Sequence, residues 1–170
     1  MRTFVIIAGG LVALGGCSSE APKKEEAATP ATLAAGQYEA SWTVDALRSV
    51  DKTTPATNLK EKATGTATGC VGDDGKLDLA LFAEDGDECT ASNAYMRNGR
   101  ISIDVSCTRK GAKGEVRQSI SGTYDAQGFK AEVSTSTYLA ETGDYAMTRT
   151  FTGKRVGACP PSSESAEKTS

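Results

Sequence analysis

Cys89–Thr108 reads CTASNAYMRNGRISIDVSCT and contains the clearest hairpin signal in the chain. Asn98-Gly99 at its centre is a sequence that type I′ turns favour, because both central residues of that turn need positive φ. The residues after the turn, ISIDVSC, alternate apolar and polar side chains, so one face of the strand would be buried and the other exposed. This segment therefore predicts two antiparallel strands, 89–97 and 100–108.

The same period of two recurs on both sides of this hairpin. Residues 38–44 and 129–133 alternate strictly, and residues 116–124 and 147–151 continue the pattern more weakly. Glycine-containing turn sequences separate these segments at hairpin spacing. The sequence predicts a mainly β domain of about seven antiparallel strands in an up-and-down meander, forming a small barrel or a strongly curled sheet. A two-sheet sandwich is the alternative.

One segment departs from the strand pattern. Lys76–Glu84, KLDLALFAE, lacks the β-branched residues that strands favour. We expect a short helical or loop insertion around 76–84, with one or two turns of helix.

The first residues resemble the signal of a bacterial lipoprotein. Arg2 precedes an apolar stretch, Phe4 to Leu14, which is followed by Gly-Gly-Cys. The stretch is too short to span a bilayer, which takes about 20 consecutive apolar residues. We therefore expect residues 1–16 to be a lipoprotein signal peptide and Cys17 to be the lipidated first residue of the mature protein. The alternative is an ordinary secretory signal cleaved nearby, which would leave Cys17 as a free thiol.

This anchor decides the expected location. A diacylglycerol thioether on Cys17 and an acylated amino terminus would hold the protein firmly, because each buried methylene contributes about 0.8 kcal/mol. Ser18, rather than Asp, follows the cysteine, which resembles the outer-membrane sorting pattern. We expect a lipid-anchored protein of the cell envelope that carries palmitate or a similar chain and faces the periplasm at the outer membrane.

Composition divides the remainder of the chain. Residues 17–34 are poor in large apolar side chains and predict an acylated anchor followed by a flexible tether. Residues 35–160 are long enough for one disulfide-bonded β domain, and residues 161–170 predict a disordered tail. The net charge of −3 and the lack of a basic stripe argue against nucleic acid as a partner.

Four cysteines remain besides Cys17, and the exported location predicts that they form two disulfides. They are Cys70, Cys89, Cys107 and Cys159. The chain has no histidine and no Cys-x-x-Cys pair, so the spacing of a zinc site is missing and we expect no metal.

The Asn98-Gly99 turn bears on how these cysteines pair. With Arg97 facing Arg100, Cys107 would face Thr90, and Cys89 would lie on the opposite face of the hairpin. A turn longer by one residue would instead bring the two cysteines face to face. We favour the pairs Cys70–Cys89 and Cys107–Cys159, with the other connectivities left open.

Several short sequences together resemble a known family. They are Gly36-Gln37-Tyr38-Glu39, Cys89-Thr90, Gly99-Arg100-Ile101-Ser102 leading to Cys107-Thr108, and Gly157-Ala158-Cys159-Pro160. In their order and spacing these residues resemble DUF3617, a domain-of-unknown-function family of proteobacterial envelope proteins. Gln37 and Tyr38 stand where the family usually has Leu and Trp. The resemblance implies a secreted, disulfide-bonded, mainly β domain, and it implies no activity, ligand or catalytic residue.

The residue types present argue against most catalytic machinery. Without histidine there is no Ser-His-Asp or Cys-His arrangement, and oxidised cysteines are not nucleophiles. We therefore expect a membrane-anchored envelope lipoprotein that is not an enzyme, has no cofactor, and acts as a non-catalytic binding or structural module. Its expected partners are the membrane, through the anchor, and a small apolar ligand or an envelope protein. Trp42 and Tyr38 could line a ligand cavity, but core packing is the favoured interpretation.

Acidic residues gather in the loop 72–88, which supports an alternative. They are Asp73, Asp74, Asp78, Glu84, Asp85, Asp87 and Glu88. Paired carboxylates can hydrolyse glycosides, and flexible acidic loops can bind calcium. The alternative function is therefore a carboxylate-dependent or calcium-assisted hydrolase that uses this loop. A solvated acidic loop is the favoured interpretation.

Overall fold

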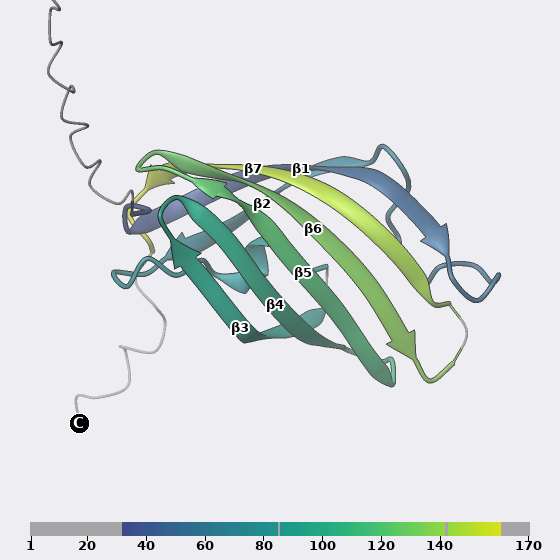
Figure 1. Ribbon diagram of the computed structural model, residues 1–170. Coiled ribbons are helices and arrows are strands. Elements are labelled where there is room, and N and C mark those ends of the chain that lie inside the picture. The colour runs from purple at the N-terminus through teal and green to yellow at the C-terminus, as the bar shows by residue number, and fades with distance from the viewer. Residues whose placement is uncertain (1–31, 85, 142, 161–170) are drawn as a thin grey trace, which may run out of the picture.

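The computed structural model describes residues 32–84, 86–141 and 143–160. They form seven strands and one short 3₁₀ helix: β1 (Gly36–Ser49), β2 (Thr64–Val71), η1 (Leu79–Leu81), β3 (Asp87–Arg97), β4 (Arg100–Arg109), β5 (Gly114–Tyr124), β6 (Gly128–Leu139) and β7 (Tyr145–Gly157). All seven strands belong to one antiparallel sheet. The sheet curls strongly into a half-barrel, with the η1 segment on its concave side (Figure 1). The predicted mainly β fold is confirmed, with a curled sheet rather than a sandwich.

The strand order explains why the half-barrel has two open edges. The order is β2-β1-β7-β6-β5-β4-β3, so the chain runs up and down from β3 to β7, and β1 pairs with both β7 and β2. β2 and β3 are the edge strands, and neither bonds to the other among the described residues. The η1 segment packs against both edges and lies across the opening between them, which we call the seam.

The hairpin signal at Asn98-Gly99 is confirmed. Arg97 faces Arg100, and the two turn residues have φ values of 52° and 71°, as a type I′ turn requires. Further along β3 the register shifts between Ala91 and Asn93, which is a β-bulge at Ser92. A bulge adds one residue to one strand and so moves every later side chain to the other face.

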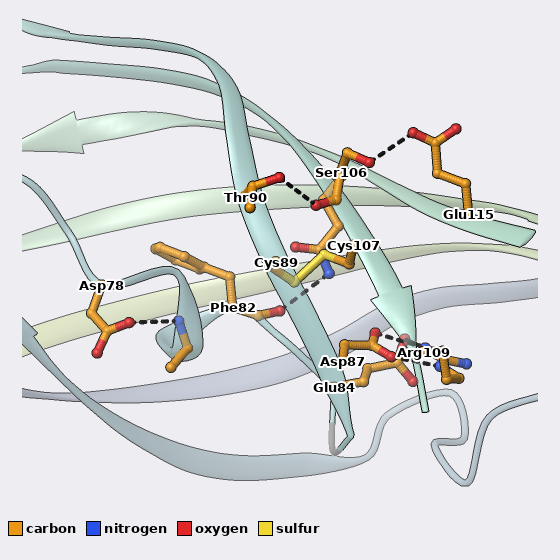
Figure 2. The surroundings of a disulfide bond; sticks show 12 residues. Asp78, Phe82, Glu84, Asp87, Cys89, Thr90, Ser106, Cys107, Arg109 and Glu115 are labelled. Atoms are coloured by element: carbon orange, nitrogen blue, oxygen red, sulfur yellow. Dashed lines mark hydrogen bonds and ion pairs between the residues drawn. A yellow bond between two sulfur atoms is a disulfide. The ribbon is translucent and has the colours of Figure 1, made fainter. Parts of the chain in front are cut away.

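The bulge overturns the first predicted disulfide. Cys89 pairs with Cys107, with Cα atoms 4.0 Å apart, and the bond links β3 to β4 (Figure 2). The predicted two-residue turn is correct, but the extra residue at Ser92 returns Cys89 to the face that Cys107 occupies. The preferred Cys70–Cys89 bond is therefore wrong.

The second predicted disulfide, Cys107–Cys159, is also wrong. Cys159 pairs with Cys70, with Cα atoms 5.9 Å apart. The end of β2 and the end of β7 both flank the start of β1, where Gln37 faces Cys70 on one side and Gly157 on the other. β4, which carries Cys107, is separated from β7 by β5 and β6. All four cysteines are thus in disulfides, but sheet order rather than sequence distance decides the pairing.

The apolar alternations predicted from sequence lie on the concave face and form the core. Ile101, Ile103, Val105 and Cys107 are all buried, while the residues between them are exposed or half-buried. An aromatic cluster connects this face to the seam: the ring of Phe82 lies 5.1 Å from that of Phe151 between centroids. Trp42 is half-buried at the edge of the core.

The insertion predicted around 76–84 is confirmed, and its helix is a single 3₁₀ turn, η1. Asp78 caps the turn by accepting a hydrogen bond from the Ala80 amide at 2.9 Å. Leu81 and Phe82 are fully buried, so this segment fills part of the half-barrel's concave side. Gly69 of β2 makes room for it, because a Cβ there would lie 2.7 Å from Leu81 Cγ.

The predicted signal peptide 1–16, Cys17, most of the tether 17–34 and the tail 161–170 lie outside the described residues. Within the described part of the chain, no helix has the length and apolarity needed to cross a bilayer.

Candidate functional site

The η1 segment leaves a hollow on each side of it. The seam cleft, on the β3 side, has a volume of about 530 Å³. The charged pocket, on the β2 side, has a volume of about 440 Å³. The seam cleft is lined mainly by Leu33, Leu77, Leu79, Ala91, Ala94, Tyr95, Met96, Ile103 and Tyr124. The charged pocket is lined mainly by Trp42, Thr57, Leu59, Ala80, Glu84, Arg109 and Arg149.

The seam cleft lies where the described residues cover the concave face of β3 only in part. Ala94 lies opposite buried Ile103, and Ala91 lies opposite buried Val105, so both alanines continue the core face of β4. Both are nevertheless exposed. An apolar strip that would be core in a closed barrel is therefore open to solvent here.

The N-terminal end of the described chain closes one end of the seam cleft. Leu33 is only 4% exposed and belongs to the main core cluster. Two side chains hold the backbone beside it: the Tyr38 hydroxyl donates to Ala34 O at 2.9 Å, and Arg155 Nε donates to Ala35 O at 2.9 Å. Burial is the main reason that the pKa of Tyr38 is raised. The chain thus enters the fold at the cleft.

Arg109, at the end of β4, organises the charged pocket. Its Nε and Nη2 donate to the two oxygens of Asp87 at 2.7 and 2.9 Å, a bidentate pair (Figure 2). Nη2 also lies 3.2 Å from Glu84 Oε1 and 3.0 Å from the Tyr145 hydroxyl oxygen, and Nη1 donates to Ala56 O at 2.6 Å. The Asp87 carboxylate raises the pKa of Arg109 against the opposing effect of burial. All three nitrogens of this guanidinium therefore have partners.

Glu84 joins the same network from the end of the η1 segment. Its Oε2 accepts from the Thr57 hydroxyl at 2.5 Å, and its Oε1 accepts from the Tyr145 hydroxyl. Burial, followed by the charge of Glu84, raises the pKa of Tyr145. Both oxygens of Glu84 are thus already hydrogen-bonded.

Arg149, in the middle of β7, has a different environment. It is 2% exposed, and its Nη2 donates to the carbonyl oxygen of Phe82. Its Nε is enclosed without a hydrogen-bond partner, and no carboxylate of the described residues lies within 4.0 Å of its nitrogens. Burial lowers the pKa of Arg149, with Glu84 opposing the shift, but a guanidinium stays charged in proteins. A charged side chain is therefore buried here without an ion-pair partner.

The acidic loop 72–88 does not form one site. Asp74 pairs with Lys76 at 2.7 Å on the surface, Asp78 caps η1, and Asp73 and Glu88 are exposed. Only Glu84 and Asp87 converge, both on Arg109. Asp85 is outside the described residues. Across residues 32–84, 86–141 and 143–160, no group of three or more acidic or cysteine side chains is arranged to hold a metal ion.

Sequence reasoning did not single out Arg149 or Tyr145. The signal was present: Tyr145, Met147, Arg149 and Phe151 share the concave face of β7, and all four are buried. An arginine on the apolar face of an alternating strand indicates a charged side chain that is buried in the core. Trp42 was assigned to the core, and it both packs against the core and lines the charged pocket.

Comparison with curated proteins finds no match, and comparison with solved structures finds none either. One family model matches the chain, over residues 33–159, and its description is "Protein of unknown function (DUF3617)". The match covers the whole half-barrel, from Leu33 in the seam cleft to Cys159 in the second disulfide. The chain therefore belongs to the DUF3617 family.

Proposed function

We propose that this protein is a membrane-anchored envelope lipoprotein whose half-barrel binds a small apolar molecule in the seam cleft, without catalysis. The observation that carries the proposal is the uncovered core face of β3, where Ala91 and Ala94 are exposed opposite buried residues of β4. Exposed apolar strips that continue a core are costly in water, since each buried Å² is favourable by about 25 cal/mol. A ligand in the cleft would supply the missing cover.

The size and lining of the seam cleft suit such a ligand. Small-molecule sites typically have volumes of about 300 to 1,000 Å³ and are mainly apolar with a few polar groups. The cleft, at about 530 Å³, lies in that range. Its walls are mostly aliphatic and aromatic, while Arg97, Lys76 and Asp74 provide polar groups. This pattern favours a molecule with an apolar body and a polar end.

The position of the cleft in the chain connects it to the expected anchor. Thr32, the first described residue, lines the cleft. About fifteen residues separate it from Cys17, and a chain of that length spans at most about 50 Å. With acyl chains on Cys17, the cleft would stay within this distance of the lipid surface, where apolar molecules are concentrated.

The acidic residues support binding rather than hydrolysis. Of the acids in the loop 72–88, Glu84 and Asp87 converge, and Arg109 holds both of them. A catalytic pair needs one carboxyl group free to take or give a proton. We therefore propose binding as the function and keep the carboxylate-dependent or calcium-assisted hydrolase as the alternative.

A charge placed in the cleft tests the proposal. The mature chain from residue 17, with Cys17→Ser, would be exported on an ordinary secretory signal and purified without detergent. N-phenyl-1-naphthylamine, an uncharged apolar dye that brightens in apolar surroundings, is then titrated against it. We expect saturable binding that Ala94→Arg weakens by at least tenfold, because the guanidinium would enter an apolar site.

Asn93→Arg is the matched control, since Asn93 is the neighbouring position on the opposite face of β3. It should bind the dye as the parent does. Equal binding by both variants, or no saturable binding by the parent, would overturn the proposed site.

A further inference from the structure

The buried guanidinium of Arg149 points to a second binding site, in the charged pocket. A buried charge is strongly destabilising unless a partner compensates it. Arg149 is 2% exposed, and one of its nitrogens donates to a backbone carbonyl, that of Phe82. Its Nε is enclosed without a partner, although buried polar groups almost always have one. Among the described residues, this guanidinium thus donates to one carbonyl oxygen and has no carboxylate within 4.0 Å.

The two neighbouring acids are hydrogen-bonded by donors other than Arg149. Arg109 donates hydrogen bonds to both carboxylate oxygens of Asp87, and its Nη2 also lies 3.2 Å from Glu84 Oε1. Glu84 is further engaged by the hydroxyls of Thr57 and Tyr145. Among the described residues, the pocket lining therefore has one carboxylate, Glu84, which donors already bind, and the guanidinium of Arg149, which has no carboxylate within 4.0 Å.

The pocket that Arg149 helps to line has an apolar wall as well. Trp42 of β1 and Leu59 of the β1–β2 loop form part of it, together with Ala80 of η1. The indole packs directly against Gly65 of β2, which has no Cβ; a Cβ there would lie 2.4 Å from Trp42 Cζ2. A ring or a short aliphatic chain would fit against this wall. The charged pocket has a volume of about 440 Å³, which suits a small molecule.

We propose that the charged pocket binds a small organic carboxylate, whose oxygens accept hydrogen bonds from the Arg149 guanidinium and whose apolar body lies against Trp42. A carboxylate supplies the negative charge and the acceptor oxygens that a guanidinium binds. This site is separate from the seam cleft and does not depend on the proposed function.

The single tryptophan of the chain provides the readout. Because Trp42 lines the pocket, its fluorescence reports occupancy directly. The mature Cys17→Ser chain is titrated with benzoate and butyrate, and in parallel with benzamide and butyramide, which have the same shapes without charge. We expect a saturable change with a carboxylate and binding at least tenfold weaker for its amide. Orthophosphate serves as the inorganic anion.

Arg149→Met removes the guanidinium and keeps an apolar chain of similar length. We expect it to weaken carboxylate binding at least tenfold. Lys154→Met is the matched control, because it removes one positive charge from an exposed position of the same strand. Far-UV circular dichroism and the melting temperature check that both variants fold.

A second variant keeps Arg149 and guards against a folding defect. Ala80 is exposed and lines the pocket, so Ala80→Phe should fill the space and abolish binding while the fold persists. Equal binding of amide and carboxylate, a response to phosphate alone, no response at all, or unchanged affinity in Ala80→Phe and Arg149→Met would each overturn the proposal.

Discussion

At Gly65, a hydrogen atom occupies the place of a side chain, and the ring of Trp42 lies where Cβ would be. The two residues face each other across β1 and β2. The same arrangement recurs at Gly153 of β7, where a Cβ would lie 2.1 Å from the ring of Phe129 on β6. A strand glycine normally weakens a sheet by leaving nothing to pack. Here an aromatic ring from the neighbouring strand covers each gap.

This pairing makes Gly65 a specific test of how Trp42 is positioned. Gly65→Ala should destabilise the protein by about 1 to 2 kcal/mol, because overpacking typically costs about 1 to 3 kcal/mol while replacing a strand glycine recovers about 0.5 to 1. Urea unfolding followed by circular dichroism measures the change, and a shift in Trp42 emission should accompany it.

Gly157→Ala is the control, since a Cβ at Gly157 meets nothing within 4 Å. It should change stability by less than about 0.5 kcal/mol. If Gly65→Ala were equally neutral, the indole would not be fixed by its contact with β2.

At the scale of the elements, the bulge at Ser92 shows how one residue decides covalent structure. The turn at Asn98-Gly99 sets the register of β3 and β4, and the bulge then resets it before Cys89. The resulting Cys89–Cys107 bond joins neighbouring strands, whereas Cys70–Cys159 crosses over the start of β1 and joins β2 to the chain after β7. The two bonds therefore close loops of very different length, 18 and 89 residues apart in sequence.

This difference predicts an order of stability. In the loop-closure model, removing Cys70–Cys159 with a double alanine substitution should cost about 4.5 kcal/mol, and removing Cys89–Cys107 in the same way should cost about 3. Guanidinium unfolding of the two double variants measures both values. A larger loss from the Cys89–Cys107 variant would show that strain or local packing, rather than chain entropy, governs these bonds.

In the molecule as a whole, the described strands do not close into a barrel. Both proposed binding sites lie at the opening between β2 and β3. In the part of the chain that the structure describes, β2 and β3 do not pair, and the η1 segment lies between them with the seam cleft on one side and the charged pocket on the other. The described chain begins at the seam cleft, at Thr32. Attachment of the chain to a membrane through Cys17 would thus limit the distance between the seam cleft and the lipid to the length of the tether.

Lipidation of Cys17 is the property on which that placement depends. In cells fed labelled palmitate, Cys17→Ala should abolish incorporation and move the protein out of the membrane fraction, because no thiol remains to carry the acyl chains. Ser18→Ala, one residue along, should retain both the label and the membrane association. Unchanged labelling of Cys17→Ala would contradict the lipid anchor. It would also remove the reason for placing the seam cleft near a membrane.

Local sequence predicts the β architecture, since alternation and turn chemistry involve residues that are close together in the chain. The strands around Ile103 and Phe129, the turn at Asn98-Gly99 and the short helical insertion near Leu79 all follow from residues within a few positions of one another. The order of the cysteines and glycines also predicts membership of the DUF3617 family, and the match over residues 33–159 confirms it.

The disulfide pairing and the candidate site depend instead on contacts between residues far apart in the chain. A single bulged residue at Ser92 reverses which face Cys89 occupies, and no local signal marks it. Likewise, the charged pocket gathers Trp42, Arg109 and Arg149 from three strands. Their meeting depends on how far the sheet curls and on where η1 crosses the seam. Such long-range packing depends on the whole chain at once, and the pattern of any one strand does not contain it.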